Sequence, residues 1–341
     1  MFCFILFLTT TFAFQCINDV GKPVDSWIIL KKPKGTTYFF YDSSEQSFRI
    51  SPHSLNDSSG GALAHTSKQL WHNDANYVIY NDQVPKLQWE DINATVLGQY
   101  GHTKGFFAFK SVSNDDNSNG FWITHSVPLF PLGPQSTNNY LGLGSNAKTY
   151  AQHLLCLSVS AKTLDTLAGA FLLNRPQIYE SKLLNTKSYE NIRNLIDGEF
   201  STGDSCLITP LQTQTGMPFH VYSKTSEWNN DLYAGCVAPY EKDTLWVETW
   251  IRGKAEGPVC PITAYDTLDI KSLDFAPLDG KWLETQDHSK WLITETNKRV
   301  CMGDINRMTS QYTRGGGTTC FTDSTLHAIM KKATTAIDKC D

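Results

Sequence analysis

Short apolar runs separated by polar, turn-forming segments follow one another along the whole chain. Runs rich in β-branched and aromatic residues predict strands at 26–32, 36–42, 76–82, 104–111, 121–127, 155–160, 243–253, 290–295 and 299–306. Apolar residues three and four apart predict helices at 61–71, 147–156 and 323–337, the last with Thr322 or Asp323 as its N-cap. Strands and helices therefore mix from end to end, which predicts an α/β (mixed α+β) fold.

The same short pattern stands before two of the predicted strands. His102 and Lys104 lead into one apolar run, and His288 and Lys290 lead into another. Residues two apart on a strand point to the same face, so each histidine projects beside its lysine. Each pair is followed by a strand, a turn and a second strand, once in each half of the chain. Two similar halves that face each other would bring both pairs to one interface, with a boundary near residue 170.

The chain has 341 residues and 40% hydrophobic composition, enough for one large folded domain or two smaller ones. Its first stretch, MFCFILFLTTTFAFQC, is a short apolar run that ends in small and polar residues, which predicts a secretory signal at residues 1–15. That run is too short to span a bilayer, and no later apolar run is long enough. The sequence therefore predicts a soluble, exported protein without a membrane anchor.

Cysteine usage agrees with export. Of the nine cysteines, Cys3 would leave with the signal, and the even number that remains predicts a disulfide framework. The absence of any C-x-x-C pair argues against structural zinc and against a thioredoxin-type redox site. Two sequons, at Asn56 and Asn93, fit the same pathway and predict a glycoprotein.

The net charge depends on pH in a way that bears on the partner. It is −5 at pH 7 with all nine histidines neutral, which argues against a permanently basic nucleic-acid binder. Protonating the nine histidines gives −5 + 9, about +4, because histidine titrates near pH 6.5. In an acidic compartment the chain could therefore attract a polyanion that it would partly repel at pH 7.

An imidazole beside an ammonium group suits phosphodiester chemistry. The lysine neutralises phosphate oxygens, and the histidine attacks phosphorus or transfers a proton. With two such pairs, one histidine can act as nucleophile and the other can protonate the leaving oxygen, without a metal ion or cofactor. One pair alone is more typical of a solvated strand end. Two pairs in matching contexts favour a reaction centre built from His102, Lys104, His288 and Lys290.

Longer stretches around these pairs carry a family resemblance. The chain resembles deoxyribonuclease II, an acid endonuclease family whose catalytic core is similar to the phospholipase D superfamily, in VDSWIILKKP, YNDQVP, GHTKGFFAF, GFWITHSVPLFP, DHSKWLITE, CMGDINR and RGGGTTC. The resemblance runs from about Cys16 to Cys340, nearly all of the mature chain. It implies two phospholipase D-like halves, residues 16–170 and 171–341, each a mixed β-sheet flanked by helices. The halves would form a pseudo-dimer with the site at their interface.

The same resemblance implies an exported or lysosomal nuclease whose substrate is DNA. It would hydrolyse phosphodiester bonds without a metal ion, work best in acid, leave 3′-phosphate ends and pass through a phosphohistidine intermediate. Both His-x-Lys pairs would be catalytic, which histidine attacks stays open, and no obligate protein partner is implied. The disulfides implied by the resemblance are Cys16–Cys156 and Cys260–Cys340, which leaves Cys206 and Cys236 as candidates for a further bridge.

The chain departs from the phospholipase D pattern after each lysine. That superfamily has an orienting aspartate five residues after the lysine, where this chain has Phe109 and Glu295. Glu295 is therefore a candidate to orient the second histidine. His125 and Asn306, on the following strands, are candidates to contact phosphate or to orient a histidine, and His125 is the candidate partner of His102. A satisfied, partly buried histidine is an equally good interpretation of His125.

The segment RGGGTTC allows two interpretations. Its glycines permit close backbone approach, so Arg314 and the glycines at 315–317 could hold a phosphate. A turn between Cys301 and Cys320, which bracket the segment and would form a disulfide, is the simpler one. The abundant aromatic residues, Trp250 among them, are assigned to the core.

Two other functions compete with an acid deoxyribonuclease. One is a secreted, catalytically weak or inactive binding or immune-modulating protein that keeps the fold. Loss of either His-x-Lys pair would favour it, and both pairs are intact. The other is a phospholipase-like enzyme, against which the family stretches outside the pairs argue. The sequence therefore predicts a hydrolase that degrades DNA.

Overall fold

The computed structural model describes residues 14–85, 99–110, 118–184, 189–251, 254–261 and 264–340. The predicted signal at residues 1–15 lies outside these ranges except for its last two residues, and the sequon at Asn93 lies outside them as well. The other sequon, Asn56, is exposed. No helix within the described ranges is long and apolar enough to cross a membrane.

The first sheet has eight strands in the described part of the chain, in the order β10-β6-β7-β8-β9-β3-β4-β5. Their bounds are Ser26–Lys31 for β3, Tyr38–Asp42 for β4, Arg49–Ile50 for β5, Ala75–Asn81 for β6, Lys104–Lys110 for β7, Asn119–His125 for β8, Gln152–Ser160 for β9 and Ile178–Lys182 for β10. Their pairings are all antiparallel. A short antiparallel pair, β1 (Cys16–Ile17) and β2 (Pro23–Val24), precedes this sheet in the chain.

The second sheet contains β11-β12-β18-β17-β16-β13-β14-β15 in that order, with β19 paired to β14. Their bounds are Cys206–Gln212 for β11, Pro218–Lys224 for β12, Leu245–Glu248 for β13, Thr267–Asp274 for β14, Lys281–Leu283 for β15, Trp291–Thr294 for β16, Arg299–Gly303 for β17, Gly316–Thr322 for β18 and Thr334–Ile337 for β19. Strands β13 and β14 run parallel and the other pairs run antiparallel, so this sheet is mixed.

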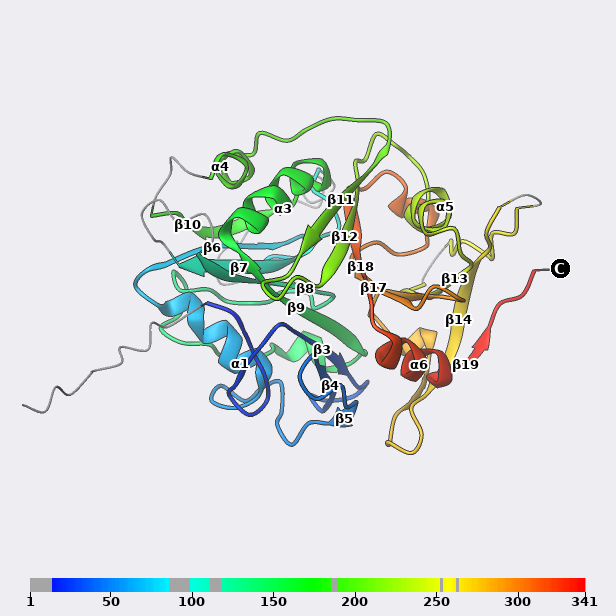
Figure 1. The fold of residues 1–341 in the computed structure, drawn as a ribbon, viewed down its shortest axis with the longest axis horizontal. Coiled ribbons are helices and arrows are strands. Elements are labelled where there is room, and N and C mark those ends of the chain that lie inside the picture. The colour runs from blue at the N-terminus through cyan, green and yellow to red at the C-terminus, as the bar shows by residue number, and fades with distance from the viewer. Residues whose placement is uncertain are drawn as a thin grey trace, which may run out of the picture.

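The helices pack on the faces of the sheets. They are α1 (Ala62–Ser67), α3 (Ala161–Asn174), α4 (Glu190–Asp197), α5 (Ala238–Glu241) and α6 (Ser324–Ala333), with single turns at η1 (Lys68–Trp71), η2 (Ser145–Lys148), η3 (Tyr233–Val237), η4 (Glu284–Gln286) and η5 (Thr309–Gln311). Helices α1 and α3 lie on opposite sides of the first sheet, whereas α5 and α6 lie beside the second (Figure 1). The N-cap of α3 is Ser160, whose Oγ accepts from the Thr163 N–H at 3.1 Å and so caps the first turn.

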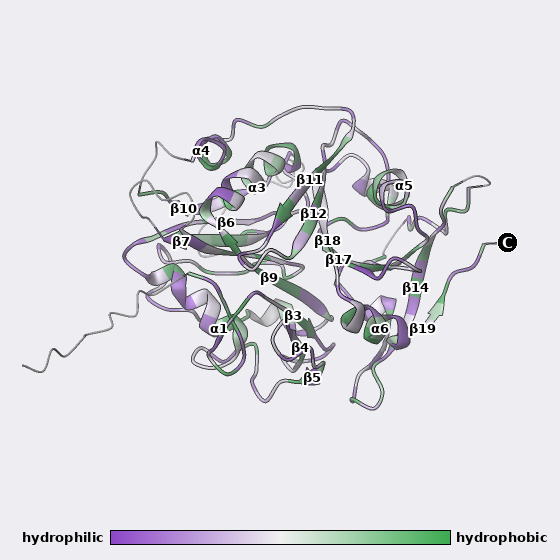
Figure 2. Ribbon diagram, in the orientation of Figure 1, coloured by the Kyte–Doolittle hydropathy of each residue, from purple (hydrophilic) through white to green (hydrophobic). Residues whose placement is uncertain are grey.

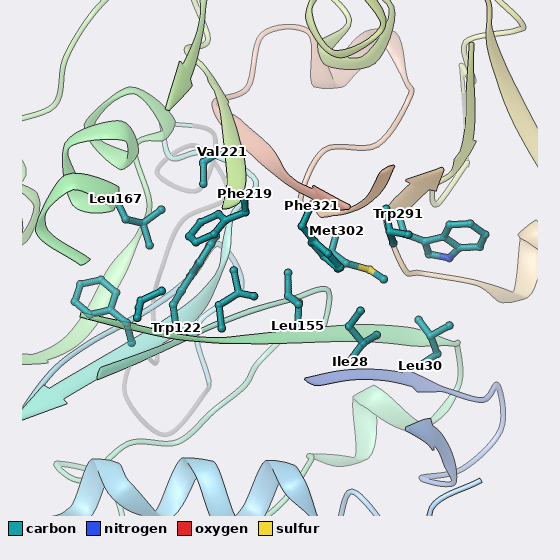
Figure 3. Packing of buried hydrophobic residues seen from close by; sticks show 14 of the residues in the cluster. Ile28, Leu30, Trp122, Leu155, Leu167, Phe219, Val221, Trp291, Met302 and Phe321 are labelled. Atoms are coloured by element: carbon teal, nitrogen blue, oxygen red, sulfur yellow. The ribbon is translucent and has the colours of Figure 1, made fainter. Parts of the chain in front are cut away.

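The largest hydrophobic core lies between the two sheets. Leu155 and Trp122 of the first sheet belong to it together with Phe219, Met302 and Phe321 of the second (Figure 3). A second cluster fills the other face of the first sheet, under α1, and a third fills the other face of the second sheet, under α5. Helices α1 and α6 carry both hydrophilic and hydrophobic residues (Figure 2), which is typical of helices that bury one side. The two sheets are therefore packed face to face.

The two sheets share an arrangement of strands. In each, three consecutive strands form an antiparallel meander, β7-β8-β9 in the first sheet and β16-β17-β18 in the second. The first strand of each meander also pairs antiparallel with one earlier strand, β7 with β6 and β16 with β13. The fold is mixed α+β and is consistent with a two-lobed phospholipase D-like architecture. The predicted boundary at residue 170 falls inside α3, a helix that contacts both sheets. The pseudo-dimer and its domain boundary stay predictions.

Most of the predicted elements are confirmed within a few residues, but the helix predicted at 147–156 is wrong. Strand β9 (Gln152–Ser160) occupies the second half of that stretch. It lies between β8 and β3, and all but its last residue are buried. A central strand buried on both faces has no polar alternation, so its apolar residues also fit a helical spacing.

Two further elements end earlier than predicted. The predicted strand at 243–253 is shortened to β13 (Leu245–Glu248), and the C-terminal helix stops at Ala333. The N-cap prediction for that helix is confirmed, because the Asp323 carboxylate accepts from the Leu326 N–H at 2.9 Å. Beyond Ala333 the β-branched pair Thr334 and Thr335 enters β19, which pairs with β14.

Four disulfides tie the described chain together. Cys16–Cys156 joins the N-terminus to β9, Cys301–Cys320 joins β17 to β18, Cys206–Cys236 joins β11 to η3, and Cys260–Cys340 joins the C-terminus to the loop before β14. All four pairings expected from the sequence are confirmed. Of the four, Cys301–Cys320 links two neighbouring strands of the second sheet, β17 and β18.

Candidate active site

Both His-x-Lys pairs lie where strands of the two sheets begin. Lys104 is the first residue of β7, and Lys290 directly precedes β16. His102, Lys104 and Lys290 are buried. Lys104 and His102 are close enough to His288 to lower its pKa, so the two pairs belong to one site.

His102 is oriented by the opposite sheet. Its Nδ1 lies 2.6 Å from the backbone carbonyl of Asp304, the residue that follows β17. Its backbone N–H donates to the carbonyl of Gly315 at 2.8 Å. A carbonyl oxygen can only accept a hydrogen bond, so Nδ1 carries the proton and Nε2 is the free nitrogen of the neutral ring.

The same arrangement surrounds His288, with the sheets exchanged. Its Nδ1 lies 3.1 Å from the backbone carbonyl of Ser126, the residue that follows β8, and 3.3 Å from Oε1 of Gln152. The Ser126 carbonyl again places the proton on Nδ1. Each sheet therefore supplies the carbonyl that orients the histidine of the other, and neither Nε2 atom has a hydrogen-bond partner among the described residues.

Asp82 binds two cations, Lys104 of the first pair and Arg314. This buried residue directly follows β6. The Lys104 ammonium donates to its Oδ1, and Nη2 of Arg314 donates to its Oδ2 at 3.2 Å. The same Oδ2 lies 3.8 Å from Nε2 of His102. Burial alone would raise the pKa of Asp82, but Lys104 and Arg314 together lower it, so the carboxylate stays ionised.

The second pair has different surroundings. Nζ of Lys290 donates to the carbonyl of His288 at 2.6 Å and lies 3.3 Å from its Nδ1. The backbone N–H of Lys290 donates to Nδ1 of the buried His153 at 3.0 Å. The ring of Trp250 packs against His288, with 5.1 Å between ring centroids, and Tyr150 packs against Trp250 at 4.3 Å.

The pKa values of the site reflect burial among several cations. Burial, followed by the charge of the nearby lysines, lowers the pKa of both His102 and His288 well below the usual range. Burial and Lys104 likewise lower the pKa of Lys290. Burial raises the pKa of Asp304 to about 7, although Lys104 and Lys290 oppose that rise. An anion entering this site would therefore meet a group of positive charges that Asp82 compensates only in part.

His125 does not orient His102, and it stays a candidate for contact with phosphate. It is the last residue of β8, where Nδ1 accepts from the Val127 N–H at 3.2 Å and Nε2 has no hydrogen-bond partner among the described residues. Burial lowers the pKa of His125 to about 3. The hypothesis that it orients His102 is corrected, because the Asp304 carbonyl occupies that position.

The other two supporting candidates are placed differently from each other. Glu295 is exposed just beyond β16, where its backbone N–H donates to Thr244 and its carbonyl accepts from Lys331. The length of β16 separates it from His288, so the structure does not bring the two together. Asn306 is buried two residues after Asp304, and its Oδ1 has no hydrogen-bond partner in the described part of the chain. It stays a candidate for contact with phosphate.

The segment RGGGTTC contributes to the site through its first residues. Besides binding Asp82, Arg314 donates to the carbonyl of Tyr100 at 3.2 Å. A Cβ on Gly315 would collide with the carbonyl of Asn174, so this close backbone approach requires glycine. The following residues, Gly316–Thr322, form β18 rather than a turn. Phe109 stands at the position where the phospholipase D superfamily has an orienting aspartate. It is a core residue packed on Tyr189.

Several residues of the site were missed by sequence reasoning. Asp82 stands in the stretch YNDQVP that carried the family resemblance, at the end of a buried strand, and this position was the only signal. Trp250 was assigned to the core but is half-buried against His288. The Ser126 and Asp304 carbonyls carry no signal in sequence, because any residue type supplies a carbonyl.

Comparison with known proteins identifies the family of this chain. The family model for Deoxyribonuclease II matches residues 15–340. A deoxyribonuclease-2-type protein of Burkholderia thailandensis is 34% identical over 331 residues, which cover 91% of this chain and 89% of that protein. Plancitoxin-1 of Acanthaster planci is 31% identical and covers 97% of this chain and 94% of its own length.

Deoxyribonuclease-2-beta of Rattus norvegicus is also 31% identical, over 90% of this chain and 87% of that protein. The family match spans nearly the whole chain, and the similarity to these relatives extends over most of their length as well. The chain is a deoxyribonuclease II-like hydrolase and belongs to the deoxyribonuclease II family.

Proposed function

We propose that this protein is an acid endonuclease that hydrolyses DNA phosphodiester bonds without a metal ion and leaves 3′-phosphate ends. The reaction would be carried by His102 with Lys104 and by His288 with Lys290. The observation that supports this most directly is the exchange of orienting carbonyls between the sheets. It leaves an Nε2 atom free on each of two histidines in one site, as a two-step displacement at phosphorus requires.

The charges around the histidines support a phosphate as the ligand. Lys104, Lys290 and Arg314 supply three cations, of which two are held by Asp82. Fixed cations in a buried site stabilise the charge that develops on phosphate oxygens during transfer. The chain's own side chains therefore supply the electrostatic stabilisation that the proposed reaction needs.

The proposed reaction has two steps. In the first, Nε2 of one histidine attacks phosphorus and forms an N–P bond, while the P–O5′ bond breaks and O5′ takes a proton from the other histidine. In the second, water attacks phosphorus and gives a proton to that second histidine, and the N–P bond breaks. The products are a 3′-phosphate on one strand end and a 5′-hydroxyl on the other.

An acidic, oxidising surrounding fits this chemistry. Below pH 7 the Asp304 carboxyl becomes neutral, since its pKa is about 7, and the site becomes more cationic. Four disulfides fit a protein that leaves the cytosol. We infer that the protein acts in lysosomes or after secretion, on DNA delivered to those compartments.

Cleavage of supercoiled plasmid at about pH 5 in excess EDTA tests this proposal. The wild-type chain is expected to nick and linearise the plasmid at an undiminished rate when EDTA is added. His102→Gln and His288→Gln are each expected to lower the rate by about a hundredfold or more, with an unchanged melting temperature. Activity that EDTA abolishes would contradict the metal-free reaction, and full activity in either variant would remove that histidine from it.

The products report which bond breaks. Fragments with 5′-hydroxyl ends accept a radioactive phosphate from polynucleotide kinase directly, whereas fragments with 5′-phosphate ends need phosphatase treatment first. We expect direct labelling. Labelling only after phosphatase treatment would mean that the P–O3′ bond is cleaved and that the leaving group is misassigned.

A further inference from the structure

The two histidines differ in what lies beside them. Nε2 of His102 lies 3.8 Å from the Asp82 carboxylate. No carboxylate oxygen in the described ranges lies within 4.0 Å of a ring nitrogen of His288. The neighbour of His288 is instead the ring of Trp250.

Asp82 and Trp250 occupy equivalent places in the two sheets. Lys104 pairs with Asn81 in the β6–β7 register, and Asp82 is the next residue. In the other sheet Trp291 pairs with Glu248, so the same antiparallel register places Lys290 opposite Thr249, and Trp250 is the next residue. One sheet thus presents a carboxylate where the other presents an indole.

This difference separates the two histidines chemically. A carboxylate beside Nε2 attracts an N–H⁺ and repels a lone pair, so it favours the protonated form of His102. It also opposes the close approach of an anionic phosphate to Nε2, which a nucleophile must allow. The indole beside His288 brings no charge, so the lone pair of that Nε2 stays available.

Asp82 can hold its charge in acid. Lys104 and Arg314 both bind it and lower its pKa, which favours the ionised carboxylate. In the empty site Lys104, Arg314 and Lys290 disfavour a proton on His102. A bound phosphodiester adds a negative charge beside these cations and offsets that effect, while the Asp82 carboxylate remains on the His102 side alone.

We propose that Asp82 is the positioning residue that makes His102 the general acid and leaves His288 as the nucleophile. This assignment rests on the proposed function and names the roles within it. Nε2 of His288 forms the bond to phosphorus, the P–O5′ bond breaks, and O5′ takes the proton from Nε2 of His102. In the second step neutral His102 takes a proton from the attacking water, and the N–P bond returns its electron pair to His288.

A change of leaving group tests the assignment. An oligonucleotide with a single bridging 5′-sulfur at the cleavage site releases a thiolate, which leaves without a proton because thiols are far more acidic than alcohols. Initial cleavage rates on this substrate and on its all-oxygen counterpart are compared at about pH 5 for the wild type, His102→Gln, His288→Gln and Asp82→Asn.

The proposal predicts a specific pattern of rescue. His102→Gln loses about a hundredfold or more on the oxygen substrate and regains most of that loss in the first turnover on the sulfur substrate. Asp82→Asn behaves in the same way with a smaller loss, at least about tenfold. His288→Gln is inactive on both substrates, because it lacks the nucleophile.

Other patterns overturn the proposal. Rescue of His288→Gln but not of His102→Gln means that the roles are reversed, and equal rescue of both or of neither removes the division of labour. An Asp82→Asn variant that matches the wild type, or that loses the same factor on both substrates, shows that Asp82 does not act through proton donation. A wild-type chain that cleaves neither substrate refutes the proposed function itself.

Asp19→Asn is the matched control. Asp19 is buried and paired with Arg49 at 3.1 Å, as Asp82 is paired with Arg314, but it lies between β1 and β2. Its substitution breaks a comparable ion pair and is expected to leave the ratio of the two rates unchanged. A changed ratio in this variant would mean that the ratio reports general destabilisation.

Discussion

Each histidine of the site is held by a backbone carbonyl from the opposite sheet rather than by a carboxylate side chain. The His-x-Lys pairs themselves could be predicted, because their residue types and their recurrence are visible in the sequence. The orienting groups could not, since a carbonyl leaves no mark on residue type. The residue types therefore favour a side chain in place of the aspartate that is missing at Phe109, and they point to His125, which does not contact His102 in the structure.

Asp304→Asn is expected to extend activity toward higher pH. The Asp304 carboxyl has a pKa of about 7, so in the wild type it ionises as pH rises through 7 and adds a negative charge beside the lysines. The added charge weakens phosphate binding. Asparagine stays neutral and keeps the backbone carbonyl that orients His102. The pH profile of DNA cleavage should therefore retain activity about one pH unit further into the alkaline range.

Asp165→Asn is the control for this shift. Asp165 also has a raised pKa, because it is partly buried, but it binds Ile192 and Asn191 of α4 away from the histidines. Its variant should keep the wild-type profile. An Asp304→Asn profile that coincides with the wild type would show that this carboxyl does not set the alkaline limit.

Strand β13 ends in a buried acid, Glu248. Both carboxyl oxygens of Glu248 lack a hydrogen-bond partner among the described residues. Burial and the nearby carboxyls of Asp287 and Glu284 raise its pKa well above the usual range. The pKa of Glu248 is therefore higher in the folded state than the value of about 4.5 in the unfolded state. Its contribution to the free energy of unfolding is complete at pH values below about 4.5, and it is lost as the pH rises through the folded-state pKa.

Glu248→Gln is therefore expected to raise stability at pH 8 and to change it little at pH 4. Glutamine has the same shape and never ionises, so it avoids a buried charge at high pH. We expect a melting temperature at least about 2 °C higher than that of the wild type at pH 8. A variant that is equally destabilised at both pH values would show that Glu248 has a partner in the folded state.

The elements that were predicted wrongly share a cause. Strand β9 is covered on both faces by the rest of the fold, so its sequence lacks the alternation by which strands are recognised. Beyond α6, pairing of β19 with β14 ends a helical spacing that the sequence continues to Ile337. In both places tertiary contacts made by distant strands override the local pattern, and these contacts are not visible in one sequence.

The two sheets share one core, so we expect the molecule to unfold as a single cooperative unit. The cluster between them contains residues of both meanders and of α3 and α6. Recurrence of the His-x-Lys pairs predicted two similar halves that meet at the site, and this pseudo-dimer stays a prediction. The order of the strands and the faces that pack could not be derived, because many orders are compatible with the same set of strands.

Leu155→Ala tests the shared core. Leu155 is fully buried between the sheets, so its truncation should lower the free energy of unfolding by about 2–5 kcal/mol. Calorimetry should show one transition in both the wild type and the variant, shifted to lower temperature in the variant. Two separate transitions, of which only one shifts, would show that the sheets unfold as independent domains.

In the proposed mechanism His288 is the nucleophile and His102 is the general acid of one phosphoryl transfer. Trapping the covalent intermediate tests this claim most directly. The His102→Gln variant is mixed with an oligonucleotide that carries the bridging 5′-sulfur at the cleavage site. The label is on the fragment whose O3′ is bonded to the scissile phosphate, because this fragment stays attached to the protein in the intermediate. The mixture is quenched in alkaline detergent, in which phosphohistidine persists, and the labelled protein is mapped by proteolysis. We expect the labelled strand on His288; a label on any other residue, or none on the protein, would contradict the account.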